Sequence, residues 1–273
     1  MIFSTQKTGD IAMLLYALLT AISSILIHAA TQHVTPLLSA CNTFLFCLIL
    51  YSIFASNLLK KIPLIQSNTH IIFILNLTTA ICWVFTFISL KYIPPELYLF
   101  TYLCALPISA AIIYRNKIRK AILLSLGLLW FLYSYHDLRI LPATALAFLG
   151  GSSGTIYSAY SKQLTHLFST IEILALRFYL TVLLTFISCL VLGQWIVLTP
   201  IYYSEFAALS FISVMIPLTL FQIGLKNLSL FRALAYMPLA PLACYFINFL
   251  LGNIAFNFIQ MSAVVFLFAT MFL

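Results

Sequence analysis

The sequence is poor in charged residues, and above all in acids. Of its 273 residues, 7% are charged, only five are Asp or Glu, and 64% are hydrophobic. An average soluble domain is about 25% charged and about 45–50% apolar. A soluble fold of this length could not cover its surface with so few polar groups. We therefore expect an integral membrane protein, because lipid tails solvate apolar side chains.

The sequence also lacks the patterns of several functional classes. No cysteine pair has CxxC spacing, and all six cysteines fall within apolar runs, so we expect buried residues and no metal site. No nucleophile with a base and no paired carboxylates have catalytic spacing, so we expect neither an enzyme nor a cofactor. The basic residues are scattered over the chain and form no stripe, which argues against binding to nucleic acid.

Long apolar runs predict an all-α membrane protein with ten transmembrane helices. A spanning helix needs roughly 20 apolar residues, and the runs are separated by short connections that hold most of the charges. The expected spans are 11–30, 35–58, 70–90, 97–114, 118–135, 142–161, 170–194, 205–225, 230–251 and 254–273.

The basic residues predict the orientation of these spans. If the N-terminus is cytoplasmic, only Lys91 and Arg139 lie on the outer side, and Arg177 falls within a span. The other ten of the 13 lysines and arginines then lie on the cytoplasmic side: Lys7, Lys60, Lys61, Arg115, Lys117, Arg119, Lys120, Lys162, Lys226 and Arg232. Cytoplasmic loops carry an excess of Lys and Arg, so we expect both termini in the cytoplasm.

An internal repeat is the most specific pattern in the chain. Segment 88–93 (ISLKYI) matches segment 223–228 (IGLKNL), which lies 135 residues later. A similar offset pairs Tyr102 with Tyr236 and Pro107 with Pro241. The offset covers five helices, an odd number, so residues 1–137 and 138–273 form two five-helix repeats of inverted orientation. Such repeats are typical of secondary transporters, whose substrate site lies near the midplane between the repeats.

These residues resemble the drug/metabolite transporter superfamily, in its ten-helix form with two EamA-like halves. Segment 171–178 (IEILALRF) is similar to the Arg-Phe pattern that opens each second helix of that family, and Pro241 precedes an apolar run that ends at Gly252. Asn253 stands where the family commonly has Glu. The resemblance implies a multi-pass transporter of the bacterial inner (plasma) membrane.

Aromatic and small polar residues near the span centres form the expected substrate site. The eight candidates are Ser24, Asn76, Trp83, Tyr102, Tyr157, Arg177, Gln222 and Tyr236. A pocket of rings with a few hydrogen-bonding groups suits a small amphipathic metabolite, such as an amino acid or a related compound. Arg177 either reaches the lipid headgroups or ties helices together, or it contacts an anionic substrate.

Several alternatives remain open at this stage. No acid lies at an expected span centre, which favours facilitated transport or exchange, with proton coupling through a histidine or Glu172 still open. The expected partners are the lipid bilayer and a small-molecule substrate, and the chain is either a monomer or a homodimer. A non-transporting membrane scaffold or assembly protein is the alternative function.

Overall fold

The computed structural model describes residues 2–115, 118–135, 137–234 and 236–272, and the regular structure within these ranges is entirely helical. Lys117, one of the basic residues that predict orientation, lies outside them. The helices from the first 137 residues are α1 (Ile2–His33), α2 (Pro36–Phe54), η1 (Ser56–Lys61), α3 (Ile62–Ser67), α4 (Thr69–Tyr92), α5 (Pro95–Tyr114) and α6 (Ile118–Tyr133). The later helices are η2 (Leu138–Ile140), α7 (Leu141–Leu164), α8 (Thr170–Leu176), α9 (Tyr179–Val191), α10 (Pro200–Leu209), η3 (Ser210–Met215), α11 (Ile216–Asn227), α12 (Leu230–Leu234), α13 (Leu239–Leu250) and α14 (Phe258–Phe272).

The described chain has several helices of membrane-spanning length, which supports the prediction of a helical membrane protein. By length and composition, seven segments are long and apolar enough to cross a bilayer: Thr5–His33, Pro36–Phe54, Thr69–Tyr92, Pro95–Tyr114, Thr170–Val191, Pro200–Asn227 and Arg232–Leu250. The apolar helices Ala121–Tyr133 and Phe258–Leu267 are shorter. The 24-residue α7 is long enough, but glycine and serine in its middle make it less apolar.

Proline marks where many of these helices begin. Pro36, Pro95, Pro142 and Pro200 each occupy one of the first two positions of a helix. Proline suits this position because the first backbone N–H groups of a helix have no intrahelical acceptor, and its fixed φ is already helical. These prolines limit the helices to lengths that match the predicted spans.

Three expected spans of the second half are interrupted, which the sequence analysis did not predict. The span expected at 170–194 is broken between α8 and α9, and the span at 205–225 contains η3, a π-helical segment. The span at 230–251 is broken between α12 and α13, just before Pro238. Proline disfavours the helical conformation of the preceding residue, which accounts for this last break.

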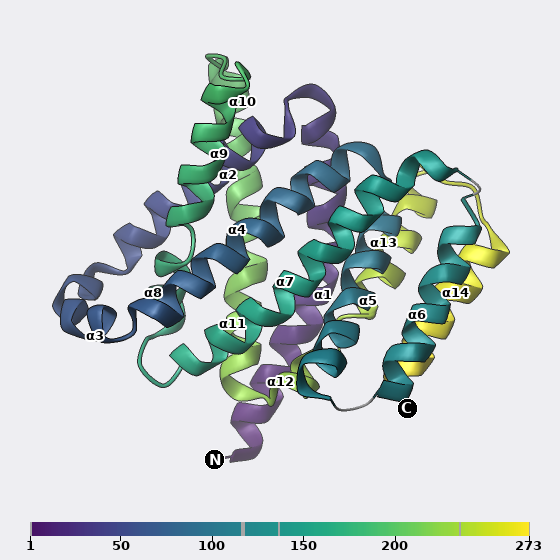
Figure 1. The fold of residues 1–273 in the computed structure, drawn as a ribbon, viewed down its shortest axis with the longest axis horizontal. Helices are drawn as coiled ribbons and strands as arrows, with labels where there is room; N and C mark the ends of the chain where they lie inside the picture. The colour runs from purple at the N-terminus through teal and green to yellow at the C-terminus, as the bar shows by residue number, and fades with distance from the viewer. Residues whose placement is uncertain (1, 116–117, 136, 235, 273) are drawn as a thin grey trace.

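Helices from the two sequence halves interleave in the bundle (Figure 1). Within this arrangement α1 packs against α11 and α13, while α4 and α5 both pack against α7. The helices α6 and α14 pair with each other at one side of the bundle (Figure 1). The buried core therefore lies between helices that are far apart in the sequence.

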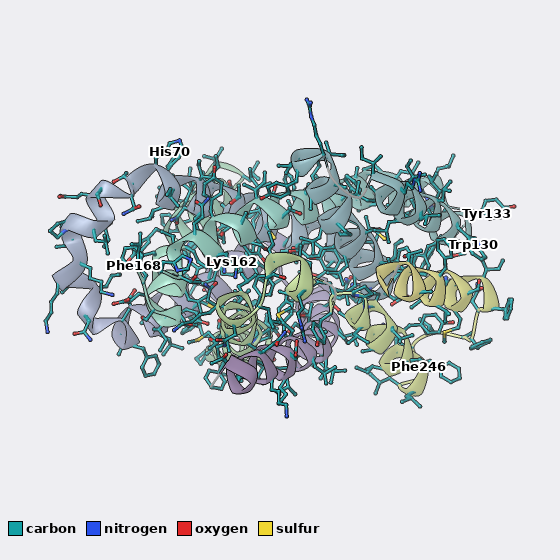
Figure 2. The ribbon with its side chains drawn as sticks, turned by 90° about the horizontal axis from the view of Figure 1, so that it is seen from below. His70, Trp130, Tyr133, Lys162, Phe168 and Phe246 are labelled. Atoms are coloured by element: carbon teal, nitrogen blue, oxygen red, sulfur yellow. The ribbon has the colours of Figure 1, made fainter. Side chains whose placement is uncertain are left out.

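Lysine side chains donate hydrogen bonds to backbone carbonyl groups at helix ends, at the margins of this bundle. The Nζ atom of Lys91 donates to the carbonyl oxygen of Thr31 at 2.7 Å, at the end of α1. The Nζ atom of Lys162, which is labelled in Figure 2, donates to the carbonyl oxygens of Leu225 and Leu228 at 2.5 Å each. Lysine near a helix C-terminus stabilises carbonyls that have no intrahelical donor.

Close packing of α5 against α7 depends on a glycine. A Cβ atom added at Gly151 would lie 2.2 Å from the backbone oxygen of Tyr102 and 2.8 Å from the Cβ atom of Ala105. Small residues at such interfaces let the backbones of membrane helices approach closely. Any larger residue at position 151 must push α5 away from α7.

We therefore predict that Gly151→Ala destabilises the protein by about 1–3 kcal/mol, the usual cost of overpacking. At roughly 2–4 °C per kcal/mol for a chain of this size, thermal unfolding of the detergent-solubilised protein should show a clear decrease. Ser153→Ala, a half-buried position on the same helix, is the control and should change the melting temperature little. Equal melting temperatures for the two variants would contradict the close approach.

Candidate functional site

An internal cavity lies where α1, α4, α5, α7, η3 and α11 meet. Its free volume is about 40 Å³, which is below the roughly 300–1,000 Å³ of small-molecule pockets, so its own side chains largely fill it in this conformation. Its walls are aromatic, aliphatic and small polar side chains, and none of them is charged: Tyr16, Thr20, Ser23, Ser24, Ile27, Cys82, Trp83, Thr86, Leu90, Tyr98, Leu99, Tyr102, Tyr157, Ser213, Pro217 and Leu218.

Four of the eight predicted site residues line this cavity. They are Ser24 on α1, Trp83 on α4, Tyr102 on α5 and Tyr157 on α7. The Nε1–H group of Trp83 is buried and has no acceptor among the described residues. A ligand in the cavity could therefore accept a hydrogen bond from it.

Sequence reasoning missed other cavity residues that lie one helical turn from the predicted ones. Thr86 follows Trp83 by three positions, and Tyr98 precedes Tyr102 by four, so each pair shares a helix face. The Thr86 and Tyr98 hydroxyls are 2.7 Å apart, and the Tyr98 and Tyr102 rings have centroids 5.5 Å apart. The Tyr102 hydroxyl also lies 3.3 Å from the Sγ atom of Cys82. The i, i+3 and i, i+4 spacing could have predicted this layer.

Asn76 lies outside the cavity and bridges the break between α8 and α9. Its Nδ2 group donates to the carbonyl oxygen of Leu176 at 2.6 Å, and its Oδ1 atom accepts from the backbone N–H of Leu180 at 3.3 Å. These two backbone groups would bond to each other in a continuous helix. The Asn76 amide thus replaces one bond of the helical ladder, which is a known cause of helix kinks.

Arg177 lies at this same break and is fully buried, with 0% of its surface exposed. Its guanidinium carbon lies 4.4 Å from the ring centroid of Tyr157 and 5.6 Å from that of Phe178. None of its three side-chain nitrogens has a hydrogen-bond acceptor among the described residues. A guanidinium that reaches lipid headgroups would be partly exposed, so the burial of Arg177 argues against the headgroup interpretation. The interpretation that Arg177 ties helices together stays open.

Gln222 and Tyr236, the remaining predicted site residues, do not line the cavity. Gln222 on α11 accepts a 2.6 Å bond from the hydroxyl of Ser161, and its buried Nε2 group has no partner among the described residues. Tyr236 lies in the turn between α12 and α13, beside the ion pair of Asp10 and Arg232. The break before Pro238 explains why Tyr236 is not placed like its expected repeat partner.

The carboxylates of the chain are all engaged elsewhere or exposed. Asp10 pairs with Arg232 at 2.7 Å, and Arg139 pairs with Asp137 at 3.0 Å and lowers the pKa of that carboxyl. Glu172 caps α8 through Ser169 and pairs with Lys61 at 2.8 Å. Glu96 is buried and accepts a hydrogen bond from Asn248 at 2.9 Å. Glu205 is exposed. The capping box and the ion pair give Glu172 a structural role at the start of α8.

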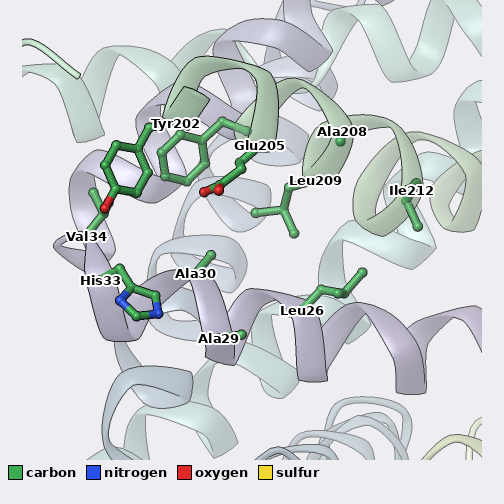
Figure 3. Close-up of a pocket in the computed structure, with 11 residues that line it drawn as sticks. Leu26, Ala29, Ala30, His33, Val34, Tyr202, Glu205, Ala208, Leu209 and Ile212 are labelled. Carbon is green, nitrogen blue, oxygen red and sulfur yellow. The ribbon is translucent and has the colours of Figure 1, made fainter. Parts of the chain in front are cut away.

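A second, larger hollow lies between the C-terminal end of α1 and α10. Its lining is apolar except for His33, Tyr202 and Glu205, which face each other across the groove (Figure 3). None of the eight predicted site residues lines it. The internal cavity is therefore the site that the sequence prediction favours.

Comparison with known proteins relates the chain to a known fold without naming a family. No family model and no curated protein matches the sequence. A solved structure described as "Crystal structure of protein" matches with a TM-score of 0.69 and 17% sequence identity. The match covers 98% of this chain and 95% of that chain, so the two share the fold over nearly their whole length.

We predict that Asn76→Ala destabilises the protein by about 1–3 kcal/mol, because two buried backbone groups lose their partner. Thermal unfolding in detergent measures the effect. Asn227→Ala is the matched control, since the Asn227 amide bonds only the carbonyl of Ile223 in its own helix, at 3.0 Å. A loss no larger than that of the control would show that α8 and α9 join into one helix without the bridge.

Proposed function

We propose that this chain is a secondary transporter that moves a small amphipathic metabolite, such as an amino acid or a related compound, by alternating access. One observation carries the proposal: an internal cavity of rings and small polar groups lies between helices of the two sequence halves. A few polar groups in a mainly apolar pocket suit a solute with both kinds of surface.

Helix contacts support two inverted five-helix repeats. If α1 corresponds to α7, α4 to α11, and α5 to α13, then the contact of α1 with α11 corresponds to that of α7 with α4. Likewise, the contact of α1 with α13 corresponds to that of α7 with α5. All four contacts occur in the bundle. A molecule with this pseudo-symmetry can exchange the shapes of its two halves, which is the basis of alternating access.

Ten spans and a cytoplasmic position of both termini complete the proposal. In this proposal the ten spans are the seven segments of spanning length together with the helices α6, α7 and α14. The basic residues on the proposed cytoplasmic side fit this orientation. We assign the chain to the ten-helix, EamA-like type of drug/metabolite transporter in the bacterial inner membrane, and we infer that it is not an enzyme.

Interrupted helices beside the cavity fit such a mechanism. Transporters commonly build their sites from discontinuous helices, whose freed backbone and buried polar groups face the substrate. Here the α8–α9 break holds Arg177, and the π-helical η3 supplies Ser213 to the cavity wall. π-Helical segments are frequent at functional sites.

Transport should depend on Trp83, whose ring lines the cavity. In proteoliposomes loaded with an unlabelled amino acid mixture, we expect uptake of labelled amino acids by counterflow. Trp83→Ala removes a buried aromatic contact of about 1.5–3 kcal/mol and should reduce uptake by about 10- to 100-fold. Trp195→Ala, at a ring that is 40% exposed, is the control and should leave uptake unchanged.

A folded wild-type protein that exchanges no amino acid, amine or nucleotide-like metabolite would favour the scaffold function instead. Equal loss of uptake in the Trp83 and Trp195 variants would show that the cavity is not the site.

Orientation can be tested by labelling single new cysteines. The six native cysteines are free and buried, so they should not react with a membrane-impermeant maleimide. In intact cells we expect labelling of Tyr92→Cys, at the outer end of α4, and no labelling of Lys226→Cys, at the cytoplasmic end of α11. Both positions are exposed. Labelling of both variants from outside, or of Lys226→Cys alone, would contradict the inverted orientation.

A further inference from the structure

The strongest unexplained feature of the molecule is the buried guanidinium of Arg177. Its residue is 0% exposed, and its Nε, Nη1 and Nη2 atoms all lack a hydrogen-bond acceptor among the described residues. Arginine keeps its positive charge in proteins. An uncompensated buried charge is strongly unfavourable, so a protein retains one only where something else offsets its cost.

No acid of this chain supplies that compensation. The sequence holds five Asp and Glu residues. Asp10, Asp137 and Glu172 each pair with a different Lys or Arg. Glu96 bonds with Asn248, and Glu205 is exposed beside the groove between α1 and α10. None of the five Asp and Glu side chains therefore pairs with Arg177.

Aromatic neighbours stabilise the guanidinium only in part. The rings of Tyr157 and Phe178 lie within cation–π distance of it. Such contacts are weaker than a bidentate pair with an oxyanion, which matches the planar donors of arginine. The Tyr157 ring also lines the cavity, so one side chain contacts both the cavity and Arg177.

Further buried donors lack an acceptor among the described residues. Trp83 lines the cavity, and its buried Nε1–H group has no acceptor among the described residues. The unpartnered Nε2 group of Gln222 belongs to a side chain that bonds Ser161, one helical turn from Tyr157 on α7. Together with Arg177, they form a set of donors that is short of acceptors. A ligand rich in oxygen acceptors complements this set.

We propose that Arg177 binds the carboxylate of the transported substrate, so that the substrate class is an organic monoanion or zwitterion with an apolar body. This inference rests on the proposed transport function and adds the substrate's charge to it. A single carboxylate fits better than a phosphate, because Arg177 is one cation and no lysine or arginine lines the cavity. The Tyr157 side chain turns aside when the carboxylate enters, since its ring covers the guanidinium in this conformation.

The test compares carboxylates with their neutral amides on purified protein in detergent. Acetate, benzoate and 3-phenylpropionate are each added beside acetamide, benzamide and 3-phenylpropanamide, and the melting temperature is followed. A ligand that binds only the folded state raises the melting temperature. We expect at least one aromatic carboxylate to stabilise the wild type more than its amide does, and to have no such effect on Arg177→Met.

The Arg177→Met variant also separates binding from a structural role. Without ligand it should melt no lower than the wild type, because an apolar side chain of similar length replaces an uncompensated charge. Arg177→Lys, which keeps the charge but loses the bidentate geometry, should bind the stabilising carboxylate more weakly, by about 10- to 100-fold in Kd. A large decrease in the melting temperature of Arg177→Met would mean that the guanidinium is a structural group, and would overturn the proposal.

Other outcomes are equally decisive. Equal stabilisation by carboxylates and amides, or no stabilisation by any carboxylate, would overturn the proposal even if the protein transports other solutes. Stabilisation by inorganic phosphate alone would replace the carboxylate with a phosphate group. If a carboxylate binds in the Arg177-dependent manner but no proteoliposome experiment shows its exchange, the binding site stands and the transport function fails.

Discussion

The requirement that every backbone polar group in a bilayer finds a partner within the protein governs this structure. A continuous helix meets the requirement by itself, so an interruption within a span needs a substitute for each lost bond. The structure shows such substitutes at two of its interruptions. Asn76 supplies both a donor and an acceptor to the α8–α9 break. At η3, Tyr51 donates to the carbonyl oxygen of Met215 at 2.8 Å.

The same low-dielectric surroundings explain how the chain distributes its charges. Ion pairs such as Asp10–Arg232 and Lys61–Glu172 occur towards helix ends, where they are partly exposed. Arg177 departs from this pattern, because it is the fully buried cation of the described chain and pairs with no acid. Ionisable groups in such a position are costly and mark functional sites by default. Arg177 lies at a helix break and contacts Tyr157, which lines the cavity, so this rule favours the cavity region as the functional site.

Much of the helical organisation follows from hydropathy and proline positions, whereas the site does so only in part. Periodicity and apolar length predict helices at all ten expected positions, because these signals are local. The α8–α9 break in the second half depends on a tertiary contact. Nothing in segment 170–194 indicates that the side chain of Asn76, about 100 residues earlier, bonds to the backbone of this segment in place of a helical hydrogen bond. Trp83, Tyr102, Ser24 and Tyr157 were predicted from central position and residue type, and they do share a cavity. Composition alone could not place Tyr236, since its position depends on how the chain turns before Pro238.

One face of α2 connects the two irregular segments beside the cavity. Thr43 accepts the hydroxyl of Ser210 at 2.7 Å, and Cys47 and Tyr51, each one turn further along, bond the carbonyl oxygens of Ser210 and Met215. The Tyr51 ring also stacks on Phe178, with centroids 6.2 Å apart, next to Arg177. Tyr51 of α2 therefore contacts both the α8–α9 break and the end of η3. A ligand can shift a two-state equilibrium only by its differential affinity for the two states. In the proposed function, a negative charge bound at Arg177 would supply such a difference, because it removes an electrostatic cost that the empty conformation carries. Through Tyr51, α2 of the first half of the chain contacts both the α8–α9 break and η3, which belong to the second half.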